Sequence, residues 1–211
     1  MHRSLVTAAA AIVSGSSKGT INWGILSTGK ISNDFVNAMK SSKNSSAFAV
    51  AARSEASAKV FAEKHTIAKV HNSYQDLVKD PDIDVVYVGS VADVHYDLAK
   101  MCLEAKKPTV IEKPLALNFR DAEELVEMAK ENNVFLMEGM WSRFFPAMKK
   151  AREIVDSGAI GDVCMVQVSL KNILFLQYIF ICVRISYPNF IRLTLGGIPK
   201  TVPKMIECGI H

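Results

Sequence analysis

The sequence predicts an α/β fold, with a doubly wound parallel sheet followed by a partial second domain of the α+β class. Between Thr20 and Glu138, short apolar runs alternate with stretches of helical periodicity. One run, Asp84 to Gly89, is apolar almost throughout, as in a parallel strand buried on both faces. With 49% hydrophobic and 22% charged residues, the chain can bury a sizeable core. This order of elements is that of the Rossmann fold.

The elements follow one another at the spacing of βαβ units. The first expected strand is Ile21 to Leu26, and a helix follows Gly29 and ends at Met39. The other expected strands are Ala47 to Ala52, Asp84 to Gly89, Thr109 to Glu112 and Val134 to Glu138. The other expected helices are Glu55 to Lys64 with Ser54 as its cap, a helix from a capping box at Ser73 to Lys79, Val94 to Ala105, and Phe119 to Glu131.

The first 20 residues differ in composition from the predicted domain at 21–140. They contain Arg3 and the apolar stretch Leu5 to Val13, and no acidic residue precedes Asp34. Two interpretations remain open for residues 1–20, a disordered extension and a weak leader peptide.

Composition changes again after Asp162. No acidic residue occurs from Val163 to Ile206, and residues 172–183 (NILFLQYIFICV) are almost wholly apolar. A transmembrane helix needs roughly 20 apolar residues. We therefore expect a buried strand or hairpin here and no membrane partner.

Charge and cysteine usage exclude several functions. The net charge is +4, but no basic run with interleaved aromatic residues indicates a nucleic-acid surface. The four cysteines show neither C-x-x-C spacing nor a histidine at metal-ligand spacing, so no metal is expected. Cys102 falls in an apolar helical pattern, typical of a small buried hydrophobe. A reducing, cytoplasmic location fits this usage.

The turn after the first strand has the features of a phosphate-binding turn. Ser27, Gly29 and Ser32 occupy the places of the three glycines in the G-x-G-x-x-G fingerprint, so only the middle glycine is present. That glycine is the one that permits close approach of a pyrophosphate to the helix N-terminus. We expect the turn to contact the cofactor through Ser27, Thr28, Gly29, Lys30 and Ile31, although a plain βα turn is the alternative.

The second strand is followed by a basic residue. NAD-binding domains normally place Asp or Glu there, about 20 residues after the glycines, to bind the ribose 2′-hydroxyl. Here Arg53 occupies that place. A guanidinium pairs with a 2′-phosphate. The sequence therefore predicts NADP as the cofactor.

The strand Thr109 to Glu112 ends in the tripeptide Glu112-Lys113-Pro114. Ligands of open α/β sheets lie beyond the carboxyl ends of the strands. A lysine at this place can act as a proton-relay group. Lys113 is therefore the candidate catalytic residue.

Several segments together resemble one known family. They are WGILSTGKIS, VAARS, SYQDLVKDPDIDVVYVGS, IEKP and FLMEGMWSRFFPAM. From Trp23 to about Val168, the chain is similar to the glucose-fructose oxidoreductase/inositol dehydrogenase (Gfo/Idh/MocA) family. Within that family it most resembles the dimeric dihydrodiol dehydrogenases, which also act as NADP-dependent D-xylose dehydrogenases.

The resemblance implies roles for individual residues. Lys113 would lie by the nicotinamide and the reacting hydroxyl, and His95 would assist cofactor binding, with a surface histidine as the alternative. Trp141 and Arg143 would enter the second domain near the cofactor, while packing is expected for Phe144 and Phe145. The implied cofactor contacts also include Ser90 and Glu112.

The last 40 or so residues depart from the family's substrate and dimerisation domain. Leu170 to Phe190 resembles no part of it, and the glycine pair Gly196-Gly197 with Glu207-Cys208-Gly209-Ile210-His211 resembles a site in which His211 is the catalytic partner. We expect 141–211 to be a truncated form of that domain, which forms the homodimer in the family. The expected function is NADP-dependent oxidation of a CH–OH group of a D-xylose-like sugar or a trans-dihydrodiol. The alternative is an inactive NADP-binding module or incomplete gene product with an interaction-prone or aggregation-prone tail.

Overall fold

The computed structural model describes residues 19–171, 176–177 and 189–195 of the chain. By its internal contacts, the chain divides into two compact units between Phe144 and Phe145. The first unit holds every predicted strand and helix up to Glu138.

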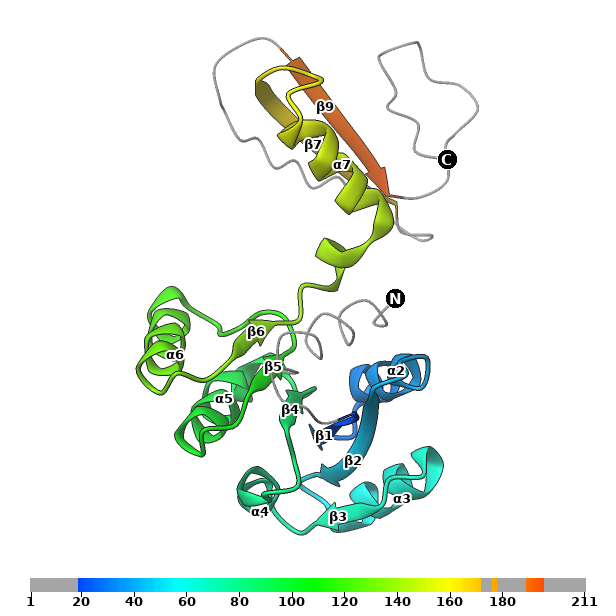
Figure 1. Ribbon diagram of the computed structural model, residues 1–211, viewed down its shortest axis with the longest axis vertical. Helices are drawn as coiled ribbons and strands as arrows, with labels where there is room; N and C mark the ends of the chain where they lie inside the picture. Colours follow the sequence, from blue (N-terminus) through cyan, green and yellow to red (C-terminus); the bar gives the residue numbers. More distant parts are fainter. Residues whose placement is uncertain (1–18, 172–175, 178–188, 196–211) are drawn as a thin grey trace. The chain divides into compact units, whose positions relative to one another are not determined.

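The first unit is built on a six-stranded parallel sheet (Figure 1). Its strands are β1 (Ile21–Leu26), β2 (Ser45–Ala51), β3 (Lys69–His71), β4 (Val85–Val88), β5 (Thr109–Ile111) and β6 (Leu136–Glu138). Their order is β3-β2-β1-β4-β5-β6, so the winding reverses between β1 and β4. This order confirms the predicted doubly wound sheet.

Helices cover both faces of the sheet. They are α2 (Lys30–Met39), α3 (Glu55–His65), α4 (Tyr74–Lys79), α5 (His95–Glu104) and α6 (Phe119–Glu131). Helices α2 and α3 lie on one face of the sheet, and α4, α5 and α6 lie on the other (Figure 1). Buried side chains of each group form a core with the face that they cover. All four residues of β4 are buried, as predicted for a central strand covered on both faces.

Local side chains set where the helices begin. Ser54 Oγ accepts a hydrogen bond from the Ser57 N–H at 3.4 Å, and Ser73 Oγ accepts one from the Asp76 N–H at 3.0 Å. Both predicted caps are confirmed. The capping box at Ser73 is only half formed, because the Asp76 carboxylate accepts from Ser73 Oγ at 2.7 Å instead of returning to the backbone.

Two elements differ from the sequence prediction. The edge strand β3 was not expected, because Val70 is an isolated apolar residue between Lys69 and His71. The helix expected at Val94 to Ala105 divides into the 3₁₀ turn η1 (Ala92–Val94) and α5, which begins at His95. Other boundaries shift by one or two residues, the usual uncertainty of helix and strand ends.

A buried carboxylate, Asp80, holds β3 in place. Its Oδ2 lies 2.7 Å from Lys69 Nζ and 2.8 Å from His71 Nε2, and its Oδ1 accepts from the Asp82 N–H at 3.0 Å. Burial alone would raise the pKa of Asp80, but these hydrogen bonds outweigh it and lower the pKa to about 2. The strand that the apolar pattern did not reveal is thus fixed by polar contacts.

The second unit begins with helix α7 (Pro146–Asp156) and strand β7 (Val163–Lys171). Strand β7 pairs antiparallel with β8 (Leu176–Gln177) and parallel with β9 (Asn189–Leu195). Most of the apolar run 172–183 lies outside the described residues, as do residues 1–18 and 196–211. Among the helices of the described part, none is long and apolar enough to cross a membrane.

Candidate cofactor and active site

The carboxyl ends of five strands meet at one edge of the sheet. Leu26 pairs with Ala51 on one side and with Val88 on the other, Val88 pairs with Ile111, and Ile111 pairs with Glu138. The residues that follow these positions include the predicted Ser27, Arg53, Ser90 and Lys113. The reversal between β1 and β4 falls at the centre of this edge, where open α/β sheets bind ligands.

Ser27 makes the tight turn after β1. Its φ is 80°, in the left-handed region that favours glycine, and its N–H donates to the Ala51 carbonyl at 2.9 Å. The first glycine of the usual fingerprint serves this turn. A serine performs the same turn here, at some conformational cost.

Gly29 is not required by its own conformation or by packing. Its φ is −66°, and a Cβ built on it would lie 3.7 Å from the nearest heavy atom, the Gly89 carbonyl oxygen. Gly29 caps α2, whose first turn contains no acidic residue and has no side-chain cap hydrogen bond. The N–H groups of that turn are therefore available to an anion, and Gly29 leaves space above them.

Close packing between α2 and the sheet depends on Gly89. Ser32 is buried in the third glycine place, and its Oγ donates to the Gly89 carbonyl at 3.3 Å. A Cβ on Gly89 would overlap Ser32 Oγ and lie 2.8 Å from Tyr87 Cε1. Gly89, in the turn after β4, therefore allows α2 to pack closely on the sheet. Ser32 occupies the position of the third fingerprint glycine, which usually serves this purpose.

Arg53 is exposed beyond the end of β2, one residue before the cap of α3. The hydroxyl of Tyr74, at the start of α4, lies beside it. Burial raises the pKa of Tyr74, while the Arg53 charge and a hydrogen bond with the Arg53 backbone oppose this. The Tyr74 hydroxyl thus lies close enough to Arg53 for the arginine charge to act on its pKa.

Ser90 has an unsatisfied hydroxyl. Its Oγ is buried and has no hydrogen-bond partner within the part of the chain that the structure describes. Buried polar atoms are normally hydrogen-bonded, so an unpaired hydroxyl at the carboxyl edge of the sheet is a candidate partner for a ligand. Together with the uncapped α2 terminus and the space at Gly29, this atom fits a bound dinucleotide.

The Lys113 loop follows β5. Lys113 is exposed and is joined to Pro114 by a cis peptide bond. Glu112 is buried, and its Oε1 accepts a hydrogen bond from the Tyr87 hydroxyl at 2.8 Å. Burial and the Glu112 carboxylate both raise the pKa of Tyr87, which keeps the hydroxyl protonated and able to donate. Glu112 therefore points into the core, and Lys113 toward solvent.

His95 lies between two loops of this edge. It is only 1% exposed, so the alternative of a surface histidine is wrong. Its Nδ1 lies 2.7 Å from the Pro114 carbonyl oxygen, and its Nε2 lies 3.1 Å from the Ser90 carbonyl oxygen. His95 thus connects the loop after β4 to the Lys113 loop.

The segment after β6 forms the 3₁₀ turn η2 (Trp141–Phe144). Trp141 is half-buried and Arg143 is exposed, while Phe144 packs against the core that contains Tyr87, as expected for a packing residue. His211, the expected catalytic partner, lies outside the described residues.

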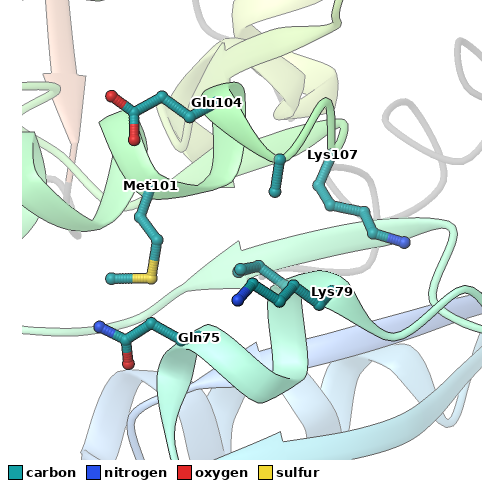
Figure 2. Close-up of a pocket in the computed structure, with 7 residues that line it drawn as sticks. Gln75, Lys79, Met101, Glu104 and Lys107 are labelled. Atoms are coloured by element: carbon teal, nitrogen blue, oxygen red, sulfur yellow. The ribbon is translucent and has the colours of Figure 1, made fainter.

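A groove of about 580 Å³ lies between α4 and α5 (Figure 2). It is lined by Gln75, Val78, Lys79, Met101, Glu104, Ala105 and Lys107. Lys79 ends α4, and Lys107 stands two residues before β5, so these lining residues lie toward the amino-terminal edge of the strands. It contains no predicted site residue and does not form part of the candidate site.

Sequence reasoning missed three residues of this edge: Tyr74, Tyr87 and Glu138. Tyr87 and Glu138 were assigned to strands, and nothing in the local sequence indicates their contacts with residues 25 and 23 positions away. Tyr74 begins the helix after Ser73, next to the end of the strand that was not predicted. Of the three, only Glu138 could have been proposed from the sequence, because it stands at the carboxyl end of a predicted strand.

Residues 21–140 match the model of an oxidoreductase family with an NAD-binding Rossmann fold, Gfo/Idh/MocA. The chain belongs to this family. The match covers the whole six-stranded sheet and the edge described above. It confirms the family resemblance that the sequence motifs indicated.

Individual relatives agree with this assignment. The chain is 49% identical over 177 residues to a trans-1,2-dihydrobenzene-1,2-diol dehydrogenase of Xenopus laevis, covering 83% of this chain and 51% of the relative. It is 42% identical over 144 residues to the enzyme of the same name from Mus musculus, covering 67% of this chain and 43% of the relative. The chain thus spans about half the length of the curated relatives it matches.

Solved structures share the fold. An NAD-binding oxidoreductase from Klebsiella pneumoniae superposes with a TM-score of 0.69 at 27% identity, covering 72% of this chain and 43% of that one. A 3-ketoreductase from Actinomadura kijaniata, crystallised with TDP-benzene and NADP, superposes with a TM-score of 0.63 at 26% identity, covering 71% of this chain and 48% of that one.

Proposed function

We propose that this protein binds NADP and acts as an oxidoreductase on a CH–OH group of a sugar or a trans-dihydrodiol. Membership of an oxidoreductase family with an NAD-binding fold supports the general reaction. The observation that carries the choice of cofactor is the exposed Arg53 beyond the end of β2, where an NAD-binding domain has a carboxylate.

Different residues at this edge would bind different groups of the cofactor. The uncapped N-terminus of α2 and the space at Gly29 suit the pyrophosphate. Arg53 suits a 2′-phosphate, and the unpartnered Ser90 Oγ suits a hydroxyl or amide group of the ligand. Thr28, Lys30 and Ile31 adjoin the same turn.

Lys113 is proposed to handle the proton. A bound oxidised nicotinamide would accept the hydride of the reacting carbon. The Lys113 amine, exposed at the end of β5, would take the hydroxyl proton as that C–O bond becomes a carbonyl. Glu112 stays in the core on Tyr87, so it orients the loop and leaves the proton to Lys113.

The substrate class comes from the relatives. Two of them carry the name of a dehydrogenase of a trans-dihydrodiol, and the sequence motifs resemble enzymes that also oxidise D-xylose. Both substrates present a secondary hydroxyl on a six-membered ring. We therefore propose trans-dihydrodiols and D-xylose-like pyranoses as the first compounds to assay.

A cofactor titration tests the proposal. Nicotinamide fluorescence would follow NADPH and NADH binding to the full chain and to Arg53→Ala. A charge-assisted hydrogen bond contributes about 1.5–3 kcal/mol, so NADPH should bind about 10- to 100-fold more tightly than NADH in the wild type only. Equal affinities in the wild type would refute the NADP assignment. Cofactor binding without turnover of either substrate would favour a binding module.

A further inference from the structure

The Lys113 loop and the end of β6 are joined by one hydrogen bond. Glu138 Oε1 accepts from the Leu115 backbone N–H at 3.0 Å, between residues 23 positions apart. Leu115 stands two residues after Lys113, and Pro114 between them has no N–H. The Leu115 amide is therefore the first backbone donor after the lysine by which the loop can be held.

The backbone of Glu138 is itself well fixed. Glu138 pairs with Ile111 in the sheet. At the following Gly139, a Cβ would lie 3.0 Å from the Ile111 carbonyl oxygen and 3.3 Å from Glu112 Oε1. The end of β6 thus packs directly on the end of β5, and a side chain that begins there can hold a neighbouring loop accurately.

We propose that Glu138 is a positioning residue for Lys113, acting through the Leu115 amide. The proposal rests on the proposed function, since it assigns Lys113 to the nicotinamide end of the cofactor. Tyr87 holds the loop before the lysine through Glu112, and His95 holds the Pro114 carbonyl. Glu138 supplies a further contact, from β6 to the Leu115 amide.

The expected effect is confined to one half of the cofactor. Removal of the acceptor leaves the Leu115 amide unpaired and lets the whole loop shift, so the backbone at the nicotinamide end moves together with the Lys113 side chain. The proposed place of the adenine half is at other strands, near Arg53 and the N-terminus of α2, so its binding should not depend on this contact. A purely structural role for Glu138 would weaken both halves together.

Two ligands separate these outcomes in the full chain. 2′,5′-ADP carries the adenine and the 2′-phosphate without nicotinamide, whereas NADPH carries both halves. In Glu138→Ala we expect NADPH to bind about tenfold more weakly, the loss of one hydrogen bond to a charged group, and 2′,5′-ADP to bind within about twofold of wild type. Hydrogen exchange at Leu115 should accelerate about tenfold or more.

Variants with graded acceptors make the test specific. Glu138→Gln retains an acceptor oxygen at the same reach and should restore NADPH affinity and Leu115 protection. Glu138→Asp is shorter by one methylene and should behave like Glu138→Ala, which keeps the test open if the alanine variant unfolds. Arg53→Ala is the matched control and should weaken both ligands by the same factor.

Three results would overturn the inference: unchanged NADPH affinity in Glu138→Ala, equal weakening of both ligands, or a Gln variant as impaired as the Ala variant. If wild-type protein binds neither ligand, the proposed function fails. Exchange at Leu115 then decides the role of Glu138, because unaltered protection in Glu138→Ala would show that it does not hold the loop.

Discussion

Two glycines at the same edge should respond in opposite ways to a single methyl group. At Gly89, a Cβ would overlap Ser32 Oγ and lie 2.8 Å from the Tyr87 ring. Neither neighbour can yield easily. Ser32 is buried, and Tyr87 is stacked on Phe35 at a centroid distance of 3.7 Å while its hydroxyl donates to Glu112.

Gly89→Ala should therefore destabilise the fold. Extra methylene groups in a packed core cost about 1–3 kcal/mol, which lowers the Tm of a chain of this size by roughly 2–12 °C. Gly29→Ala should leave stability nearly unchanged. Replacing glycine by alanine lowers the entropy of the unfolded chain, which stabilises the fold by about 0.4–1 kcal/mol. Alanine is a poorer N-cap than glycine, which destabilises the fold by a similar amount.

Gly29→Ala, although it should barely change stability, should weaken cofactor binding. The nearest heavy atom to its built Cβ is 3.7 Å away, an ordinary van der Waals contact, so a methyl group there fits the protein without strain but occupies the space proposed for the pyrophosphate. We expect NADPH affinity to fall more than tenfold, or about 1.4 kcal/mol. Urea unfolding followed by tryptophan fluorescence, together with NADPH titration, measures both quantities. A Gly29→Ala protein with wild-type NADPH affinity would refute the placement of the pyrophosphate.

Three further outcomes follow from the same structure. Lys113→Met should keep NADPH affinity within several-fold, because it changes one exposed side chain and leaves the loop backbone held by Glu138, and should abolish turnover of D-xylose or a trans-dihydrodiol; retained turnover would exclude Lys113 as the proton-relay group. Asp80 stabilises the fold above the ordinary carboxyl pKa of 3.8, and this contribution, about 2 kcal/mol, should be lost as pH falls toward 2; the acid unfolding curve of Asp80→Asn should lack that dependence. Ser27→Gly should raise stability or leave it unchanged, because φ is 80° there, and a clear drop in Tm would show that the serine side chain is required.

The sequence by itself determined the elements and the edge at which the site lies. Apolar runs separated by helical patterns specify βαβ units, and parallel strands bring their carboxyl ends together. Arg53 and Lys113 could therefore be assigned to that edge without coordinates. Such signals are local, because neighbours in the chain decide whether a segment forms a strand or a helix.

Tertiary structure decided which side chains meet. The contacts of Glu138 with Leu115, Tyr87 with Glu112 and His95 with two carbonyl groups join segments that only the register of the sheet brings together. The short strand β3 belongs to the same class, since the carboxylate of Asp80 holds it where an apolar pattern is absent. A hydrogen bond between distant residues depends on distances set by the whole sheet, and no periodicity in the sequence records them.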